Sequence, residues 1–255
     1  MKKSLINKIN NREVTVGVIG LGYVGLPLVL RFSEAGFKTI GFDIDKEKVN
    51  DLNKGNTYIK HIYSQDVKAA VKCGFTATAD FSKISISDIL IICVPTPLGT
   101  HNEPDLSFVK NTLSSIKPYL IENQVLILES TTYPGTTEQE IVPEIEDIGF
   151  EIGKNFFVCF SSEREDPGNK KFKLFDITKV FSGHTEQCSK IFKKFYGSVF
   201  KKIHYAKTLE IAEMSKLLEN IYRSVNIGLI NEMKIISKIF KINIFEAIEA
   251  AKTKP

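Results

Sequence analysis

Short apolar runs alternate with amphipathic stretches through most of the chain. The runs that predict strands are 14–19, 38–42, 89–94, 125–128 and 156–160, with shorter ones at 179–182 and 201–205. The stretches with helical spacing include 26–35, 106–120, 137–148 and 187–196. Strands that alternate with helices predict an α/β fold with a doubly wound, mainly parallel sheet.

Polar clusters follow three of these expected strands, at 95–105, 129–137 and 161–169. In an open α/β sheet, ligands bind in the crevice outside the carboxyl ends of the strands. We therefore expect the three clusters to surround one site.

The pattern changes near Leu209, where apolar residues begin to recur at helical spacing as far as Phe240. About thirty residues at ~1.5 Å each form a helix of ~45 Å. A helix of that length predicts a spine between domains or a dimer interface. Lys216 and Asn220 are four residues apart and so share one helical face. Periodicity alone favours a solvated lysine there and equally allows an exposed asparagine.

Gly20, Gly22 and Gly25 form a GxGxxG motif between the first expected strand and the first expected helix. In a Rossmann-type dinucleotide site, the first glycine makes a tight turn and the second lets the backbone approach a pyrophosphate. The third lets the helix pack closely on the strand. Asp43 ends the next strand, where a carboxylate accepts the ribose hydroxyls. The motif and the acid together predict a bound dinucleotide.

Charge near Asp43 favours NAD over NADP as that dinucleotide. Asp45 follows closely, and no arginine stands beside the two acids to receive a 2′-phosphate. A carboxylate at this position hydrogen-bonds a free 2′-hydroxyl and repels a phosphate. Lys46 and Lys48 are long enough to reach a phosphate, but the balance of charge still predicts NAD.

Composition sets limits on the function. The chain of 255 residues has 43 % hydrophobic and 25 % charged residues, and its net charge of +4 is too small to indicate nucleic-acid binding. The four cysteines, at 73, 93, 159 and 188, have no spacing typical of a disulfide framework or a metal site. No stretch is long enough to span a bilayer. We therefore expect a cytoplasmic protein without a bound metal or a membrane partner.

Five motifs together resemble the UDP-glucose/GDP-mannose dehydrogenase family, most closely its bacterial UDP-N-acetylglucosamine 6-dehydrogenases of surface-polysaccharide synthesis. They are GLGYVGLPL, CVPTPL, ESTTYPGTT, SSEREDPGN and AEMSKLLENIYRSVNIGLINEMK, in the order and spacing of that family. The resemblance implies a two-step oxidation of the C6 alcohol of a UDP-sugar to a carboxylate with two NAD. In that family a cysteine attacks the intermediate aldehyde, and water later releases the acid. Enzymes for UDP-glucose, UDP-N-acetylmannosamine and GDP-mannose share these motifs, so the sugar stays open.

The resemblance also implies roles for individual residues. Asp43 and Lys48 would hold the adenosine ribose, and Thr96 would contact the cofactor. Thr132 would position water or the cofactor near the reacting carbon. Glu163 would lie between substrate and cofactor and serve in acid/base chemistry or water activation. The expected cofactor-binding residues are Gly20, Gly22, Tyr23, Val24, Gly25, Asp43, Lys48, Pro95, Thr96 and Thr132.

The remaining catalytic residues come from the long helix. Lys216 would stabilise oxyanion charge at C6, and Asn220 would hydrogen-bond the sugar or the same oxygen. One departure is Ser162, where the family usually has a proline, and this change would loosen the loop that aims the acid/base glutamate. The second carboxylate of that loop could be Glu165 or Asp166.

By this resemblance, residues 1–207 form an NAD-binding Rossmann-like domain and residues 208–255 begin an all-α dimerisation domain, which predicts a homodimer. The family's catalytic cysteine lies in a GGHC segment shortly beyond the point that Pro255 occupies, and its C-terminal nucleotide-sugar domain has no counterpart here. We therefore expect the N-terminal part of such an enzyme, inactive alone. The alternative is a non-catalytic NAD-binding dimerisation module that needs a separate cysteine-bearing domain. A stand-alone β-hydroxyacid-type dehydrogenase is disfavoured by the STTYPGTT and SSEREDPGN segments.

Overall fold

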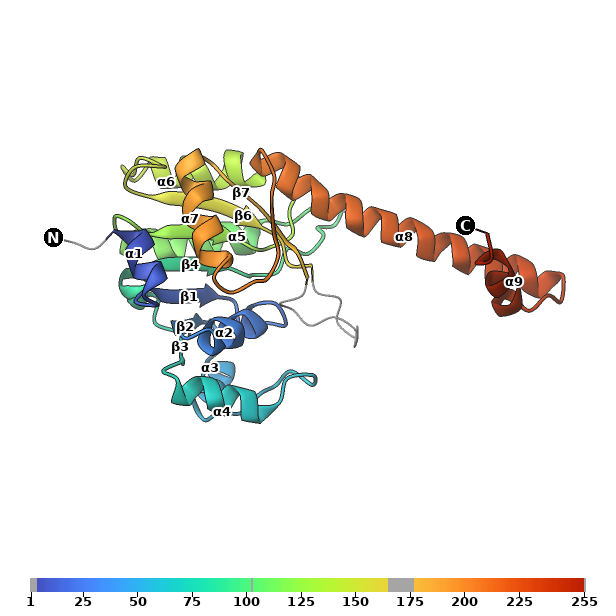
Figure 1. Ribbon diagram of the computed structural model, residues 1–255, viewed down its shortest axis with the longest axis horizontal. Helices are drawn as coiled ribbons and strands as arrows, with labels where there is room; N and C mark the ends of the chain where they lie inside the picture. Colours follow the sequence, from blue (N-terminus) through green and yellow to red (C-terminus); the bar gives the residue numbers. More distant parts are fainter. Residues whose placement is uncertain (1–3, 102, 165–176, 255) are drawn as a thin grey trace. The chain divides into compact units, whose positions relative to one another are not determined.

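The computed structural model describes residues 4–101, 103–164 and 177–254 (Figure 1). Its strands form one sheet in the order β3-β2-β1-β4-β5-β6-β7-β8. They are β1 (Thr15–Ile19), β2 (Lys38–Phe42), β3 (Thr76–Thr78), β4 (Ile89–Ile92), β5 (Val125–Leu128), β6 (Phe157–Ser161), β7 (Lys179–Gly183) and β8 (Ile203–Tyr205). Neighbouring strands are parallel except β6 and β7, which are antiparallel. The first six strands have the order of a doubly wound dinucleotide-binding sheet, so the predicted fold class is confirmed.

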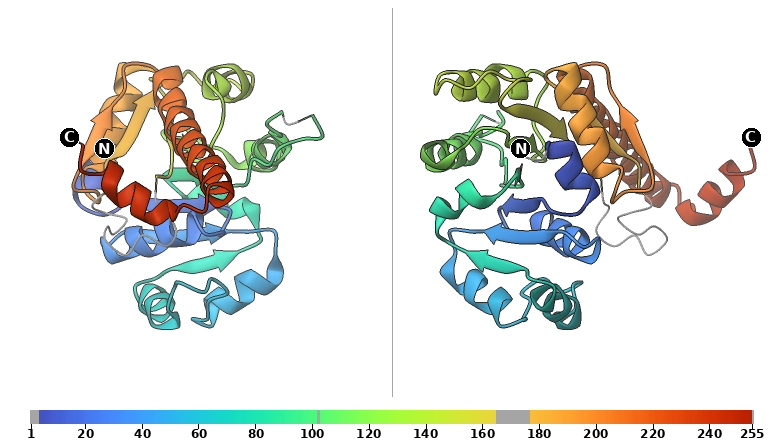
Figure 2. Two further views of the ribbon diagram at one scale, coloured as in Figure 1. Left: turned by 90° about the vertical axis from the view of Figure 1, so that its right-hand side faces the viewer. Right: turned by 60° about the vertical axis from the view of Figure 1, so that its left-hand side comes forward.

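Helices cover both faces of the sheet. The α-helices are α1 (Leu5–Asn10), α2 (Gly25–Glu34), α3 (Lys46–Asn53), α4 (Ser64–Lys72), α5 (Ser107–Ile116), α6 (Val142–Glu146), α7 (Glu186–Tyr196), α8 (Leu209–Ile239) and α9 (Ile244–Ala251). The described residues also form two 3₁₀-helices, η1 (Phe81–Ile86) and η2 (Lys117–Tyr119), and a π-helical turn, η3 (Thr137–Ile141). Figure 2 shows α1, α2 and α7 on one face, with α5 and α6 on the other. None of the helices in the described residues has the length and apolar character needed to cross a membrane.

The contacts divide the chain into two units, Met1–Met214 and Ser215–Pro255. The first unit contains the whole sheet and the first turns of α8. The second contains the rest of α8 and the short helix α9. Asn243 caps α9, where its side chain accepts a hydrogen bond from the backbone N–H of Phe245 at 3.1 Å.

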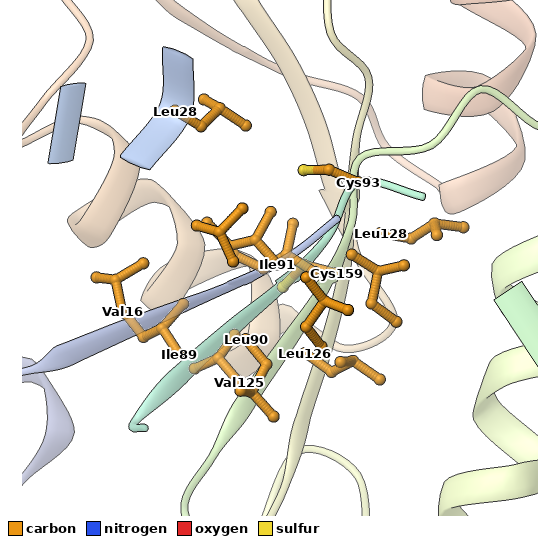
Figure 3. Packing of buried hydrophobic residues seen from close by; sticks show 14 of the residues in the cluster. Val16, Leu28, Ile89, Leu90, Ile91, Cys93, Val125, Leu126, Leu128 and Cys159 are labelled. Carbon is orange, nitrogen blue, oxygen red and sulfur yellow. The ribbon is translucent and has the colours of Figure 1, made fainter. Parts of the chain in front are cut away.

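The central strands carry apolar side chains on both faces. β4 and β5 are buried at every position, and Figure 3 shows side chains packed from Val16 through Ile91 to Leu126. Parallel strands that are covered on both sides have continuous rather than alternating apolar sequences. This burial explains why the runs 89–94 and 125–128 are recognisable as strands from sequence alone.

Aromatic side chains join α2 to α7 on their shared face. The ring of Phe32 stacks on Phe195 with centroids 4.9 Å apart and meets the edge of Tyr196 at 5.7 Å. Phe192 and Tyr196, one turn apart on α7, stack at 4.1 Å. Such pairs add to the energy of burying the rings. The result is an aromatic layer between α2 and α7, in which Tyr196 is fully buried.

The helix expected over 137–148 has a different local geometry. It begins as a π-helical turn, η3, and becomes α-helical only at Val142. Pro143 has no backbone N–H, so the α-helical hydrogen bond to the residue four before it cannot form. The widened turn follows the segment that carries Thr132.

Candidate cofactor and active site

Two of the three motif glycines are required by close backbone contacts. Gly20 has φ +90°, and a Cβ there would lie 2.9 Å from the carbonyl oxygen of Cys93. A Cβ on Gly25 would lie 1.9 Å from the carbonyl oxygen of Gly20, which no side chain could accommodate. The turn after β1 is therefore compressed between the end of β4 and the start of α2. Only glycine lets these three segments meet.

Gly22, the middle glycine of the motif, faces open space. No heavy atom lies within 4 Å of a Cβ built on Gly22. Val24 caps α2 without any side-chain hydrogen bond, whereas Thr185 at the start of α7 accepts one from Cys188. A helix N-terminus favours anions through its backbone dipoles. The turn therefore has room for a dinucleotide pyrophosphate beside the N-terminus of α2.

Asp43 ends β2 beside this turn and organises it. One carboxylate oxygen accepts the N–H of Leu21 at 2.9 Å, and the other accepts the N–H of Asp45 at 3.0 Å. An ionised carboxylate has about four acceptor positions, so both oxygens can also accept ribose hydroxyls. Asp45 instead caps α3 through the N–H groups of Glu47 and Lys48. Of the two acids, Asp43 is the one placed at the glycine turn.

Lys48 and Tyr58 stand close to the same place. The ammonium of Lys48 lies 3.6 Å from a carboxylate oxygen of Asp45 and 5.7 Å from the centre of the Tyr58 ring. The Tyr58 hydroxyl donates to the carbonyl oxygen of Leu21. Burial, and then the charges of Asp43 and Asp45, raise the pKa of Tyr58, so it stays a donor at neutral pH. Sequence reasoning missed Tyr58, because a tyrosine in a polar loop carries no recognisable pattern.

The loops after β4 and β5 are joined by side-chain hydrogen bonds. Thr96 donates to the carbonyl oxygen of Thr131 at 2.6 Å, and Ser130 donates to that of Val94 at 2.6 Å. Thr132 is 4 % exposed, and its hydroxyl has no hydrogen-bond partner among the described residues. A buried polar group without a partner is costly, and this hydroxyl lies in the loop that follows β5 at the carboxyl edge of the sheet.

Three other predicted cofactor residues differ in exposure. Tyr23 is 67 % exposed and Pro95 is exposed, while Val24 packs partly against the core. Of these, Val24 supports the turn from below. Tyr23 and Pro95 border the carboxyl edge of β1 and β4.

Glu163 belongs to a buried cluster of charged groups. Its carboxylate lies 3.0 Å from the ammonium of Lys179, which lies 2.7 Å from the carboxylate of Glu129. The second oxygen of Glu129 accepts the hydroxyl of Tyr196 at 2.6 Å. The other oxygen of Glu163 accepts the backbone N–H of Arg164 at 2.6 Å. Sequence reasoning found Glu163 but none of the partners in this cluster.

Burial and charge act against each other in this cluster. Burial lowers the pKa of Lys179, but the two carboxylates outweigh it, so the pKa of this lysine lies above its ordinary value and the ammonium stays charged. Burial raises the pKa of Glu129, opposed by the charge of Lys179. Burial and then the charge of Glu129 raise the pKa of the Cys93 thiol. Cys93 is therefore a neutral thiol at pH 7 and a poor nucleophile.

Glu213, on the first turns of α8, is a second buried acid that sequence reasoning missed. It accepts the N–H of Gly135 at 2.6 Å, and the N–H and hydroxyl of Thr137 at 2.8 and 2.7 Å. Burial raises the pKa of Glu213, and these hydrogen bonds oppose the rise. In the sequence, Glu213 is an acid among apolar residues at helical spacing. An analysis of apolar periodicity passes over such a residue.

The structure thus brings the glycine turn, Asp43, Lys48, Thr96, Thr132 and Glu163 into one unit. Lys216 and Asn220 lie on α8 in the second unit, one helical turn apart, and their catalytic roles stay predictions. Glu165 and Asp166 lie outside the described residues. Within the described part of the chain, no group of histidine, cysteine, aspartate and glutamate side chains is arranged to hold a metal ion.

Comparison with known families agrees with this geometry. Residues 14–200 match the NAD binding domain of the UDP-glucose/GDP-mannose dehydrogenase family, and residues 210–255 match its central domain. The chain belongs to this family. The match confirms both the resemblance seen in the motifs and NAD as the cofactor.

Several relatives of the chain are known. It is 34 % identical to the UDP-N-acetyl-D-glucosamine 6-dehydrogenase of Salmonella typhi, over 95 % of this chain and 57 % of that enzyme. A solved UDP-D-ManNAc dehydrogenase from Pyrococcus horikoshii has a TM-score of 0.88 at 32 % identity, covering 94 % of this chain and 58 % of that one. A ternary complex of GDP-mannose dehydrogenase from Pseudomonas aeruginosa has a TM-score of 0.84 at 26 % identity, covering 94 % and 56 %. The chain therefore spans a little more than half the length of these relatives.

The two contrasting glycines give a matched pair of variants. We expect Gly22→Ala to keep the stability of the protein but to weaken NAD binding at least tenfold (about 1.4 kcal/mol), because the new methyl group occupies the approach of the pyrophosphate. We expect Gly25→Ala to lower the free energy of unfolding by about 1–3 kcal/mol or more, because it meets the Gly20 carbonyl. Urea denaturation and calorimetric titration with NAD check the pair. Equal loss of stability in both variants would contradict this account of the turn.

Proposed function

We propose that this chain is the NAD-binding part of an enzyme that oxidises the C6 alcohol of UDP-N-acetylglucosamine to the uronic acid for surface-polysaccharide synthesis. The observation that carries the proposal is that the buried cluster of Glu163 and the open turn at Gly22 lie at the same edge of the sheet. The motif resemblance and the Salmonella typhi relative support this sugar. Relatives named as UDP-N-acetyl-D-mannosamine dehydrogenases are 32–35 % identical, so UDP-N-acetylmannosamine is the competing substrate.

The residues of the first unit supply binding and proton chemistry. NAD, when bound, accepts hydride from the substrate carbon. Asp43 holds the ribose, and the uncapped N-terminus of α2 holds the pyrophosphate. Glu163 takes a proton from the C6 hydroxyl or from the attacking water, since an ionised carboxylate in a partly dry site is a competent general base. The unpartnered hydroxyl of Thr132 orients the group that reacts.

The long helix contributes the electrophilic part of the proposal. Lys216 stabilises negative charge on the C6 oxygen, and Asn220 hydrogen-bonds the same oxygen or the sugar. Their four-residue spacing on α8 puts both polar groups on one helical face. Lys216 is half-buried, and where bound substrate and cofactor exclude water an ammonium stabilises a developing oxyanion far more than it would in bulk water.

The choice of cofactor rests on Asp43. We expect Asp43→Ala to weaken NAD binding by about 1.5–3 kcal/mol, roughly 10- to 150-fold, because charge-assisted hydrogen bonds to the ribose are lost. Asp45→Ala is the matched control and should change the affinity little, since its carboxylate caps α3. Calorimetry with NAD and NADP measures both variants. Equal affinity of the unmodified chain for the two cofactors would refute the assignment.

A second copy of the chain is the partner that we propose for α8. Apolar side chains spaced along this helix are 40–71 % exposed in the second unit, which is more apolar surface than a monomer usually shows. They are Leu218, Tyr222, Val225, Leu229, Met233 and Ile236.

Sedimentation tests this interface. We expect a dimer at micromolar concentration, and a monomer after Leu229→Lys combined with Tyr222→Lys, because two charges per helix cannot be buried unpaired. Asn231→Lys is the control on the same helix and should leave the dimer intact. A monomeric unmodified chain would rule the interface out.

Turnover measurements test the proposed enzymatic activity. None of the four cysteines lies in the family's GGHC context, and Cys93, Cys159 and Cys188 are buried. We expect the 255-residue chain to bind NAD but to give no useful turnover, because none of its four cysteines has that context. Substrate positioning, which can lower a barrier by ~7–11 kcal/mol, would also be incomplete.

Supplying the C-terminal half of a homologous enzyme should then release two NADH per sugar. UDP-N-acetylglucosamine should react at least tenfold faster than UDP-N-acetylmannosamine, UDP-glucose or GDP-mannose. Stoichiometric NADH production by the chain alone would contradict the proposal. Cysteine-to-serine variants at 73, 93, 159 and 188 would then identify the nucleophile.

A further inference from the structure

The reversal of one strand places a lysine next to the expected general base. β7 runs antiparallel to β6, with Phe160 opposite Ser182 and Ser161 opposite Phe181. Continuing this register by two residues puts Lys179 opposite Glu163. The observed ion pair of 3.0 Å confirms the placement. A parallel strand would have put its first residue at the far edge of the sheet, so this pair depends on the reversal.

Lys179 is held more firmly than a surface lysine. Its side chain is 2 % exposed, and that of Glu129 is 0 % exposed. The ammonium lies 5.5 Å from the ring centre of Phe200 and 5.9 Å from that of Tyr196. Glu129 is fixed by its own backbone, since its N–H donates to Ile92 at 2.9 Å. A buried charge is tolerated only when it is paired in this way.

The lysine is shared unequally between two carboxylates. It is closer to Glu129, at 2.7 Å, than to Glu163, at 3.0 Å, and Glu129 also accepts the phenol of Tyr196. Among the described residues, two further titratable groups lie near the cluster: the neutral thiol of Cys93, and the guanidinium of Arg164, which donates to the carbonyl oxygen of Thr178 at 2.8 Å. Glu163, whose side chain is 11 % exposed, is the member of the cluster with access to a ligand.

We propose that Lys179 is a positioning residue for Glu163, and that Glu129 sets how much of the lysine's charge Glu163 receives. The ammonium fixes one carboxylate oxygen of Glu163 and favours its ionised form. Glu129 competes for the same ammonium and so limits how strongly the ammonium stabilises the ionised form of Glu163. The role of Glu163 as a base rests on the proposed function, whereas the control of its ionisation does not.

The proposal predicts shifts of opposite sign for two substitutions. Removing the ammonium with Lys179→Met leaves Glu163 facing the charge of Glu129, so its titration should move to higher pH. Glu129→Gln keeps the shape of the side chain but removes the second negative charge beside Lys179. The ammonium then pairs with Glu163 alone, so the titration of Glu163 should move to lower pH. A neighbouring charge shifts the pKa of a carboxyl group by about 1–3 pH units. We expect the titration midpoint of Glu163 to move by at least about one pH unit in each direction. Lys179→Arg keeps the charge and should restore the unmodified behaviour.

Carbon-13 NMR of the glutamate carboxyl groups measures these shifts in the full chain with no substrate present. The Glu163 resonance is identified by its loss in Glu163→Gln. Hydrogen exchange at the N–H of Arg164, which donates to Glu163, reports whether the carboxylate is still held. It should quicken at least tenfold in Lys179→Met and stay slow in Lys179→Arg, while exchange in β1 and β2 stays unchanged.

Thermal denaturation establishes that each variant is folded. If Lys179→Met does not fold, Glu129→Gln and Lys179→Arg carry the test. Midpoints that do not move in Glu129→Gln, or a Lys179→Arg variant that differs from the unmodified chain as much as Lys179→Met does, would overturn the proposal. Because no turnover is measured, this failure is distinct from a failure of the proposed enzymatic activity.

Discussion

The contact between Gly25 and the carbonyl oxygen of Gly20 fixes the geometry on which the cofactor site depends. With no side chain between them, α2 starts directly on the turn that ends β1. The same turn is pressed against the end of β4 at Cys93. The helix N-terminus, the carboxyl end of β1 and the acid at the end of β2 therefore converge. Asp43 completes the arrangement, because it accepts the N–H of Leu21 and so holds the turn in place.

A different constraint governs the other half of the site. The antiparallel β7 brings Lys179 to the carboxyl edge of the sheet. The aromatic layer between α2 and α7 contains Tyr196, whose hydroxyl donates to Glu129. Two carboxylates, an ammonium and a phenol are thereby satisfied where water is largely excluded. An incomplete version of this cluster would leave a buried charge unpaired. Glu163 is thus held by its ion pair with Lys179 and by the backbone N–H of Arg164.

Local patterns account for what the sequence could predict. The central strands are covered on both faces, so their apolar runs stand out, and the glycine motif requires specific backbone contacts that only glycine permits. The short elements α1, α3 and β3 were not predicted, since six, eight and three residues give little periodicity. Lys179, Tyr196 and Glu213 could not be found as site residues, because their partners lie 16 to 78 residues away in the sequence. Burial alone would have predicted apolar residues at Lys179 and Glu213.

Glu213 connects the beginning of α8 to the loop that follows β5. Its carboxylate gathers three donors from the turn Gly135–Thr137, three residues beyond Thr132. Detaching α8 from that turn would break the hydrogen bonds of two backbone N–H groups and one hydroxyl to the carboxylate, and a hydrogen bond to a charged group contributes about 1.5–3 kcal/mol. The first turns of α8 and the loop of Thr132 therefore keep one relative position. The beginning of α8, within the first unit, is thus held to the loop after β5 by a buried side chain.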